Sequence, residues 1–343
     1  DLLHTANLPA PAITDPSKYF QVDTFTGTGA ENVRSYTDAS STNVSPDLSW
    51  GKDRDTATNH VLTNSVGGAQ LVTHSNTGDA EASDAQGLKS FDAGGVTLGT
   101  STEWNAAGAQ VIWNWVEDNA TAGLDILEYS GTDTANENKS HSLSSAPEMA
   151  MVRRLDSGSD MYFWHTALTG ADYFCKINGT AAESNSDSPW GTGNWSSSQF
   201  MVDTGVENIN ASGGTYLAML WHSVAGFSKA FSYIGNANND GTYVDLGFAP
   251  RFIFVFKASA GGENKQFFTW DIETHNDGTC APLEPNTTGS ESAVSTRALD
   301  FLARGFKVRT SNDALNTSGA TYVGMAFAEF PFGGDGVSQA RAR

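Results

Sequence analysis

The sequence predicts an all-β protein made of three tandem antiparallel β-sandwiches of about 100 residues each. Hydrophobic residues make up 39% of the chain and charged residues only 17%. The polar remainder is dominated by Gly, Ser, Thr, Asn and Asp, which form turns rather than helices. One motif also occurs three times, about 105 residues apart. The copies are NAAGAQVIWNWVED from Asn105, NASGGTYLAMLWHS from Asn210 and NTSGATYVGMAFAE from Asn316.

Other landmarks recur in step with this motif. Each copy opens with a Gly-containing turn after an aromatic residue, and a proline later marks the first residue of a strand, where no ladder donor is needed. An Asn then precedes a Glu in a stretch rich in Asn, Thr and Gly, which predicts a loop. The turns follow Phe25, Tyr129 and Tyr233, the prolines are Pro46, Pro147 and Pro250, and the loop pairs are Asn76 and Glu81, Asn178 and Glu183, Asn286 and Glu291.

The second half of each copy predicts core positions. An aromatic column at Phe91, Trp195 and Phe301 is expected to anchor the core. The closing strands align as Val111, Tyr216 and Tyr322, then Ile112, Leu217 and Val323, and finally Val116, Trp221 and Phe327. Adjacent residues in these strands are apolar, which is typical of a strand covered on both faces.

These landmarks divide the chain into repeats at about 19–120, 121–227 and 228–332. Residues 1–18 contain three prolines and residues 333–343 read GGDGVSQARAR, so both ends are expected to be extended arms. Each Gly-containing strand, with the Asn-x-x-Gly turn and aromatic strand that follow, faintly resembles the second half of concanavalin-like or SPRY-type sandwiches. Each repeat is expected to be a jelly-roll or concanavalin-like sandwich. Whether the repeats have separate cores is left open.

Charge and apolar patterning exclude several classes of partner. The formal net charge is −20, so phosphate-rich partners are repelled and nucleic-acid binding is not expected. Apolar runs such as FIFVF at 252–256 are too short for membrane insertion, and the first residues lack the features of a secretion signal. Cys175 and Cys280 do not fall at matching places in the repeats, so we expect isolated buried thiols.

The sequence contains few motifs typical of catalysis or metal binding. Nucleophile-elbow, zinc and phosphate-loop motifs do not occur, the seven histidines are scattered, and we predict no catalytic residues. One loop places Asn236, Asn238 and Asp240 before Gly241, alternating as in calcium loops, although Gly247 stands where a bidentate Glu belongs. A surface turn is favoured over a Ca²⁺ site there, and no other cofactor is expected.

Aromatic residues offer a better candidate for ligand binding. Sugar rings have an apolar face and a hydroxyl edge, so glycan-binding proteins place exposed aromatic rings beside polar side chains. Trp190 has no counterpart in the other repeats and lies in a loop with Pro, Gly, Asn and Asp, which makes it the first candidate for stacking on a ligand. Trp104, just before the closing strand of the first repeat, is the second. The alternative for Trp190 is packing against its own sandwich or another subunit.

Several segments together resemble an uncharacterised repeat family of virion proteins from marine tailed phages. They are SPDLSWGKDRDTATNHVL, the pairing of RGFKVRTS with NTSGATYVGMAFAE, and the ends LLHTANLPAPAITDPSKYF and PFGGDGVSQARAR. The resemblance covers nearly the whole chain and implies a location in the virion after synthesis in the host cytoplasm. It carries no catalytic residues.

The sequence leaves three functions open. The first is a tail fibre or spike component, expected as a homotrimer, that binds a host-surface glycan or protein and attaches to other virion proteins through its arms. The second is a capsid-decorating structural protein without a ligand. The third and most remote is a polysaccharide depolymerase, which nothing in the residues favours.

Overall fold

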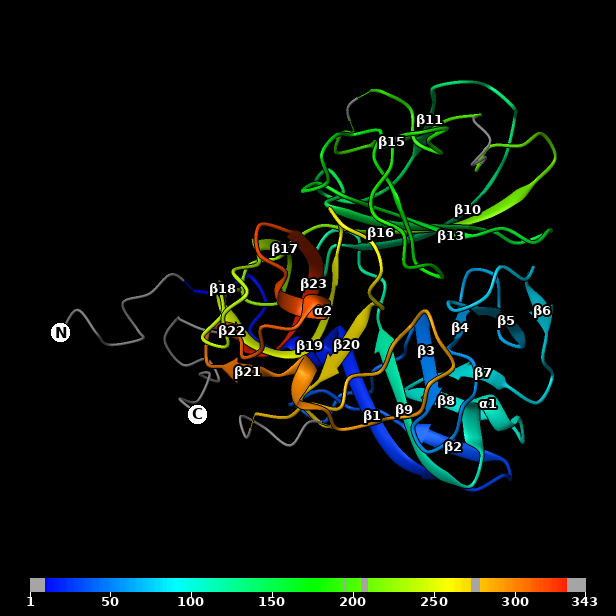
Figure 1. The fold of residues 1–343 in the computed structure, drawn as a ribbon. Coiled ribbons are helices and arrows are strands. Elements are labelled where there is room, and N and C mark those ends of the chain that lie inside the picture. The colour runs from blue at the N-terminus through cyan, green and yellow to red at the C-terminus, as the bar shows by residue number, and fades with distance from the viewer. Residues whose placement is uncertain (1–9, 194, 205–208, 273–277, 332–343) are drawn as a thin grey trace.

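The computed structural model describes residues 10–193, 195–204, 209–272 and 278–331, and this part of the chain is nearly all β (Figure 1). Its strands form antiparallel sheets that pack in pairs, and its two α-helices have four residues each. The predicted all-β sandwich fold is therefore confirmed. The boundaries of the three repeats stay a prediction, although the sheet pairs fall within the expected ranges.

The first sandwich combines a six-stranded sheet, in the order β1-β9-β3-β4-β5-β6, with a three-stranded sheet, β2-β8-β7. Its strands are β1 (Phe20–Gly27), β2 (Asn32–Ser35), β3 (Leu48–Asp53), β4 (Val61–Asn64), β5 (Leu71–His74), β6 (Ala82–Ser83), β7 (Leu88–Asp92), β8 (Gly95–Leu98) and β9 (Gly108–Trp115). Helix α1 (Thr102–Asn105) precedes β9, and the 3-10 turn η2 (Pro16–Lys18) precedes β1.

The second sandwich combines the sheet β10-β16-β12-β13-β14 with the pair β11-β15, and the third combines β17-β23-β19-β20 with β18-β22-β21. The strands of the second are β10 (Leu124–Ser130), β11 (Glu137–Ser140), β12 (Met149–Arg154), β13 (Met161–His165), β14 (Cys175–Lys176), β15 (Gln199–Val202) and β16 (Thr215–Trp221). Those of the third are β17 (Ser228–Ile234), β18 (Tyr243–Asp245), β19 (Phe248–Lys257), β20 (Gln266–Thr269), β21 (Leu299–Leu302), β22 (Gly305–Val308) and β23 (Thr321–Pro331), with η3 (Ser295–Arg297) and α2 (Asp313–Asn316).

The three larger sheets share one strand order. In each, the first strand pairs with the closing strand, which pairs in turn with the strand that follows Pro46 or Pro147 in the first two sandwiches and contains Pro250 in the third. Each larger sheet packs one face on its own smaller sheet, around a separate apolar cluster. The predicted aromatic column lies against these clusters, because Phe91, Trp195 and Phe301 each contact the cluster of their own sandwich.

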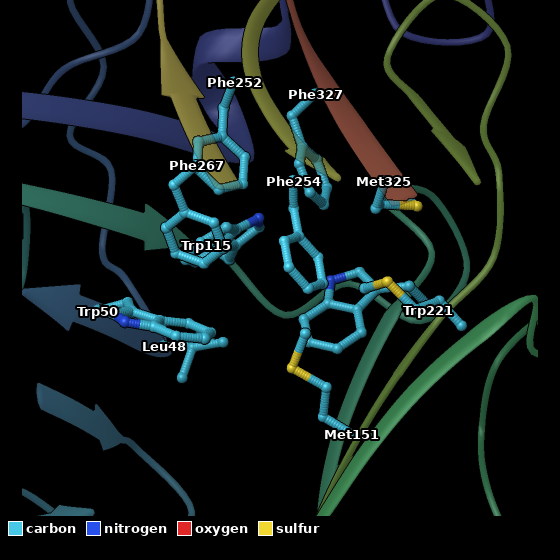
Figure 2. Close-up of a pocket in the computed structure, with 11 residues that line it drawn as sticks. Leu48, Trp50, Trp115, Met151, Trp221, Phe252, Phe254, Phe267, Met325 and Phe327 are labelled. Atoms are coloured by element: carbon cyan, nitrogen blue, oxygen red, sulfur yellow. The ribbon is translucent and has the colours of Figure 1, made fainter. Parts of the chain in front are cut away.

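The other face of every larger sheet contributes to a single core shared by the three sandwiches. Matching positions on the closing strands, Trp115, Trp221 and Phe327, meet there together with Leu48, Met149 and Phe252 from their neighbours. Figure 2 shows these side chains around a cavity of about 20 Å³, whose lining residues are at most 4% exposed. The closing strands are thus covered on both faces, as their sequence predicts.

The strand pairing corrects the predicted alignment of the first repeat by one residue. Leu48 pairs with Trp115 as Met149 pairs with Trp221, so Trp115 and not Val116 is equivalent to Trp221. In the same way Gln110, rather than Val111, is equivalent to Tyr216. The turn after the buried Asn is one residue shorter in the first repeat, and a slip of one residue exchanges the two faces of a strand.

The predicted Asn…Glu loops join the sandwiches in a closed ring. The backbone N–H of the Glu in each loop donates to the next sandwich: Glu81 to Leu155 O at 2.9 Å, Glu183 to Ala258 O at 2.7 Å, and Glu291 to Arg54 O at 2.8 Å. Buried cations strengthen two of these contacts, since Arg153 donates to Thr77 O at 3.1 Å and Lys265 to Gly179 O at 2.5 Å. The first sandwich therefore contacts the second, the second the third, and the third the first.

The described part of the N-terminal segment packs on the body of the molecule. Ile13 is 4% exposed and belongs to the shared core, and the N–H of Ala12 donates to Ala225 O. The boundary of an N-terminal arm at residue 18 stays a prediction. Residues 1–9 and the predicted C-terminal arm at 333–343 lie outside the described part.

The Asn of the motif that recurs three times is buried and joins two segments of the chain by hydrogen bonds. Asn105, Asn210 and Asn316 are fully buried, and each side chain bonds the loop that follows the first strand of its sandwich. The glycine in that loop permits the approach. At Gly131 an added Cβ would lie 2.1 Å from Ala211 O, and at Gly27 it would lie 1.9 Å from Ala106 O.

Candidate functional site

The predicted ligand-stacking tryptophans are buried. Trp190 is 1% exposed in the core of the second sandwich, and its ring centroid lies 5.4 Å from that of Trp195. Trp104 is also 1% exposed and packs in the core of the first sandwich. Both predictions are wrong. Burying a large indole ring is strongly favourable, and the polar residues beside it in the sequence do not prevent that burial.

The predicted calcium loop is an internally bonded turn. Asn236 Oδ1 accepts from Asn238 N at 3.0 Å, and Asn238 Oδ1 accepts from Asp240 N at 2.9 Å. Asp240 forms ion pairs with Lys307 at 2.5 Å and Arg309 at 2.8 Å, and the hydrogen bond and charge of Lys307 lower its pKa. These contacts do not fit a Ca²⁺ site, because the oxygens already have donors and two cations flank the carboxylate.

His60 and His165 are buried and make hydrogen bonds inside the protein. His60 Nδ1 accepts from Trp50 Nε1 at 3.3 Å, and burial lowers the pKa of His60 well below its ordinary value. His165 Nε2 lies 3.2 Å from Gly324 O, and burial lowers the pKa of His165 to about 4. Both rings are therefore neutral near pH 7 and lie in or beside the shared core, away from solvent.

An open site lies on the third sandwich, between the edge strands β17 and β18. This β17–β18 slit has a volume of about 470 Å³ and is lined by residues 229–234 and 242–245. Phe231, Tyr233 and Val244 are buried at its floor, with exposures of 4 to 6%. Ile234 and Tyr243 are 54% and 46% exposed, which makes Tyr243 the exposed aromatic residue of this region.

The floor of the slit is rigid. Tyr233 stacks on Tyr322 with ring centroids 4.9 Å apart and donates its hydroxyl hydrogen to Leu315 O at 2.8 Å. Phe306 packs edge-on against Phe231 from the smaller sheet at 5.2 Å. A ligand entering the slit would therefore meet an apolar surface that is already formed.

Polar groups close one end of the slit. Lys229 Nζ donates to Asp245 O at 2.7 Å, and Arg304 donates to both carboxylate oxygens of Asp245, at 2.9 and 3.2 Å. The side chains of Arg304 and Asp245 are both 47% exposed. The slit therefore combines an apolar floor with a charged end that water reaches.

One position that lines the slit differs in chemistry among the three sandwiches. Arg34, Lys139 and Val244 occupy the same position, each paired with the equivalent residue of the neighbouring strand. Arg34 lies 4.2 Å above the Phe25 ring and Lys139 lies 5.2 Å from the Tyr129 ring. In the third sandwich this position holds the short, apolar Val244, which is 6% exposed and lines the slit.

A second concavity lies nearby but is purely polar. It has a volume of about 690 Å³, and its described lining includes Glu263, Arg309, Asn312 and Asp313 but no aromatic residue. Arg309 is already paired with Asp240 and Asp300. This polar cleft therefore lacks the apolar face that a sugar ring or a hydrophobic side chain requires.

Neither Tyr243 nor the slit is predicted from the sequence. The strand that carries Tyr243 has only three residues, and its burial alternates between exposed and buried. The signal in the sequence is that Val244 stands where the other two repeats have the basic residues Arg34 and Lys139. The strands that carry these residues are too short to be aligned from their composition alone. Their equivalence becomes visible only through pairing with the neighbouring strand.

Comparisons with known proteins place the chain in a family without giving it a function. A family model described as a domain of unknown function, DUF7483, matches residues 15–331. No curated protein and no solved structure matches the chain. Within the described residues there is no group of three or more His, Cys, Asp and Glu side chains placed to hold a metal ion. The described helices are also too short to cross a membrane.

Proposed function

The chain belongs to the DUF7483 family, and we propose that it is a non-catalytic virion protein that binds a host-surface glycan through the β17–β18 slit. The open slit beside an exposed tyrosine carries this proposal. The sequence resemblance to phage virion proteins supports the location. The attachment of the protein to a tail fibre or spike remains part of the proposal.

The size and chemistry of the slit favour a glycan. Its volume of about 470 Å³ lies within the range of roughly 300 to 1,000 Å³ that small-ligand sites occupy. The half-exposed ring of Tyr243 offers a face for a sugar ring, and Asp245 and Lys229 in the lining offer acceptors and donors to its hydroxyls. The outward backbone groups of the edge strands β17 and β18 add further partners.

The architecture supports binding rather than catalysis. Buried titratable side chains such as His60, Arg153 and His165 are committed to contacts within and between the sandwiches. The shared core gives the slit a stiff support, and a site fixed on strands binds without ordering a loop first. The homotrimer expected from the sequence would present three such slits and raise avidity.

The test compares two variants at the same structural position. Tyr243→Ala removes the exposed ring, whereas Val33→Ala changes the equivalent exposed residue of the first sandwich, 63% exposed, beside Arg34 over the Phe25 ring. Fluorescently labelled chain is titrated onto purified surface polysaccharides and whole cells of marine bacteria. We expect Tyr243→Ala to weaken binding about tenfold, as loss of a stacked ring predicts, and Val33→Ala to bind as the parent does.

Three outcomes would contradict the proposal. Equal binding by Tyr243→Ala and the parent would exclude the slit as the site. Failure of the parent to bind any polysaccharide or cell, together with antibody labelling spread over virion heads, would favour a capsid-decorating protein. Release of reducing ends from a polysaccharide would instead indicate a depolymerase.

A further inference from the structure

The buried Asn of the second sandwich has a different environment from its two counterparts. Asn105 Nδ2 donates to the carbonyl of Gly99, and Asn316 Nδ2 donates to Asn236 Oδ1 and to backbone carbonyls. Asn210 Nδ2 donates to Thr134 O at 2.9 Å and also to the carboxylate oxygen Glu137 Oε2 at 2.8 Å. A carboxylate therefore touches the buried amide in the second sandwich.

A lysine amine meets the same carboxylate oxygen. Lys139 Nζ lies 2.9 Å from Glu137 Oε2 and donates to Ser130 O at 3.0 Å. Glu137 and Lys139 are two residues apart on β11, so their side chains lie on the same face of the strand. Because both nitrogens contact one oxygen, the Lys139 amine and the Asn210 amide are within two hydrogen-bond lengths of each other.

We propose that Lys139 and Asn210 become joined by an intramolecular isopeptide bond, with Glu137 as the catalytic residue. Glu137 takes a proton from the Lys139 ammonium, and the neutral amine attacks Cγ of Asn210. Glu137 returns this proton to Nδ2 and takes up the second proton of the attacking nitrogen as the Cγ–Nδ2 bond breaks, so the products are a secondary amide, ammonia and a protonated Glu137. One amide bond replaces another and one ammonia molecule leaves, so no oxidant, metal or cofactor is required.

The surroundings of the cluster suit this chemistry. Lys139 is 9% exposed and its amine lies over the Tyr129 ring, so the amine is largely shielded from water. Burial raises the pKa of Glu137, but hydrogen bonds from Lys139, Thr132 and Asn210 outweigh it and lower the pKa overall. Glu137 is therefore ionised near pH 7 and can accept a proton, which is the first step.

The other two sandwiches lack the reacting groups. In the first, Arg34 occupies the position of Lys139 and Asn32 that of Glu137. A guanidinium stays protonated and is not a nucleophile under these conditions. In the third, Val244 and Thr242 occupy the same positions. The proposed bond is thus specific to the second sandwich.

The bond would tie the two sheets of one sandwich together. Lys139 lies on β11 of the smaller sheet, and Asn210 lies just before β16, the closing strand of the larger sheet. A covalent link there opposes separation of the sheets under heat or mechanical load, as a cross-link between distant residues does. This role is independent of ligand binding by the third sandwich.

Mass spectrometry of the purified full chain tests the proposal. We expect an intact mass below that of the sequence by one ammonia molecule, and a branched tryptic peptide that contains both Lys139 and Asn210. Lys139→Arg and Glu137→Gln should each restore the full mass. Arginine is tolerated at this position, since Arg34 occupies it in the first sandwich.

Lys176→Arg is the matched control. Lys176 Nζ lies 2.8 Å from Asp160 Oδ2 while Asn178 donates to Oδ1 of the same carboxylate at 2.7 Å, so amine and amide meet different oxygens. The Lys176 and Asp160 side chains are also 27% and 33% exposed. This variant should keep the mass loss of the parent.

Three results would overturn the proposal. A parent chain with the full sequence mass would exclude the bond. A loss of ammonia without a branched peptide would indicate a cyclised asparagine elsewhere instead. Persistence of the branched peptide in Glu137→Gln would show that the reaction does not require the Glu137 carboxylate.

Discussion

Replacing Arg153 tests how the sandwiches are held together. Its side chain is fully buried on β12 of the second sandwich, and its guanidinium donates to the carbonyls of His74, Thr77 and Asp79 in the loop of the first. Burial lowers the pKa of Arg153, although the group stays charged because its ordinary value is so high. Arg153→Met keeps much of the apolar stem but removes all three donors.

The expected loss is large. A hydrogen bond from a charged group contributes about 1.5 to 3 kcal/mol, and removing one side of a buried polar contact costs about 3 to 5 kcal/mol. Contributions within one cluster are not additive, so we expect Arg153→Met to lower the free energy of unfolding by about 3 to 5 kcal/mol. Against a typical total of about 5 to 15 kcal/mol this is a major fraction.

The neighbouring arginine provides the control. Arg154 forms an exposed ion pair with Asp156 at 2.9 Å, with side chains 25% and 37% exposed. Arg154→Met should therefore cost no more than about 1 kcal/mol. Both variants are compared by urea denaturation followed through tryptophan fluorescence, with hydrogen exchange of the Glu81 amide as a local probe. Equal losses in the two variants would refute the structural role given to Arg153.

Three further predictions concern single positions. Gly131→Ala should cost several kcal/mol and lower the melting temperature, because its Cβ would lie 2.1 Å from Ala211 O, too close for any side chain. Trp190→Ala should destabilise the chain by about 3 to 5 kcal/mol in chemical denaturation, because it empties a buried site. Glu117→Gln should raise the melting temperature at pH 8 but not at pH 5, because burial and the nearby Asp125 carboxyl raise the pKa of Glu117 to about 7.

The sign of the pH effect follows from linkage. Between about pH 4.5 and 7 the folded chain holds a proton on Glu117 that the unfolded chain releases, so stability falls as pH rises through this window. Glutamine has no such proton to lose. A parent and a variant with parallel melting temperatures from pH 5 to 8 would contradict the shift. For Gly131→Ala and Trp190→Ala, unchanged unfolding curves would contradict the contacts described.

The all-β fold was predictable because its signals repeat. A single turn residue or aromatic residue is weak evidence for a β-sandwich. The recurrence of the same residue types about 105 residues later is not expected by chance and makes the evidence stronger. The apolar neighbours in the closing strands also predicted burial on both faces. What covers the second face could not be predicted, because the shared core is formed by residues from all three sandwiches.

The site was harder to predict, and the reason is physical. Trp190 and Trp104 stand in polar, Gly-rich surroundings, yet each ring folds inward, because loop composition does not determine where a large side chain is buried. Tyr243 stands out only when Val244 is compared with Arg34 and Lys139 across paired strands. The cluster of Glu137, Lys139 and Asn210 likewise depends on a contact between distant segments.

The central structural claim is that the sandwiches form one unit through the shared core and the closed ring of loop contacts. Differential scanning calorimetry of the full chain tests it most directly. We predict a single transition whose calorimetric enthalpy equals the van't Hoff enthalpy, because no sandwich can unfold without exposing the core of the other two. Two or three resolved transitions, or a calorimetric enthalpy several times the van't Hoff value, would show that the sandwiches unfold independently and would contradict the account.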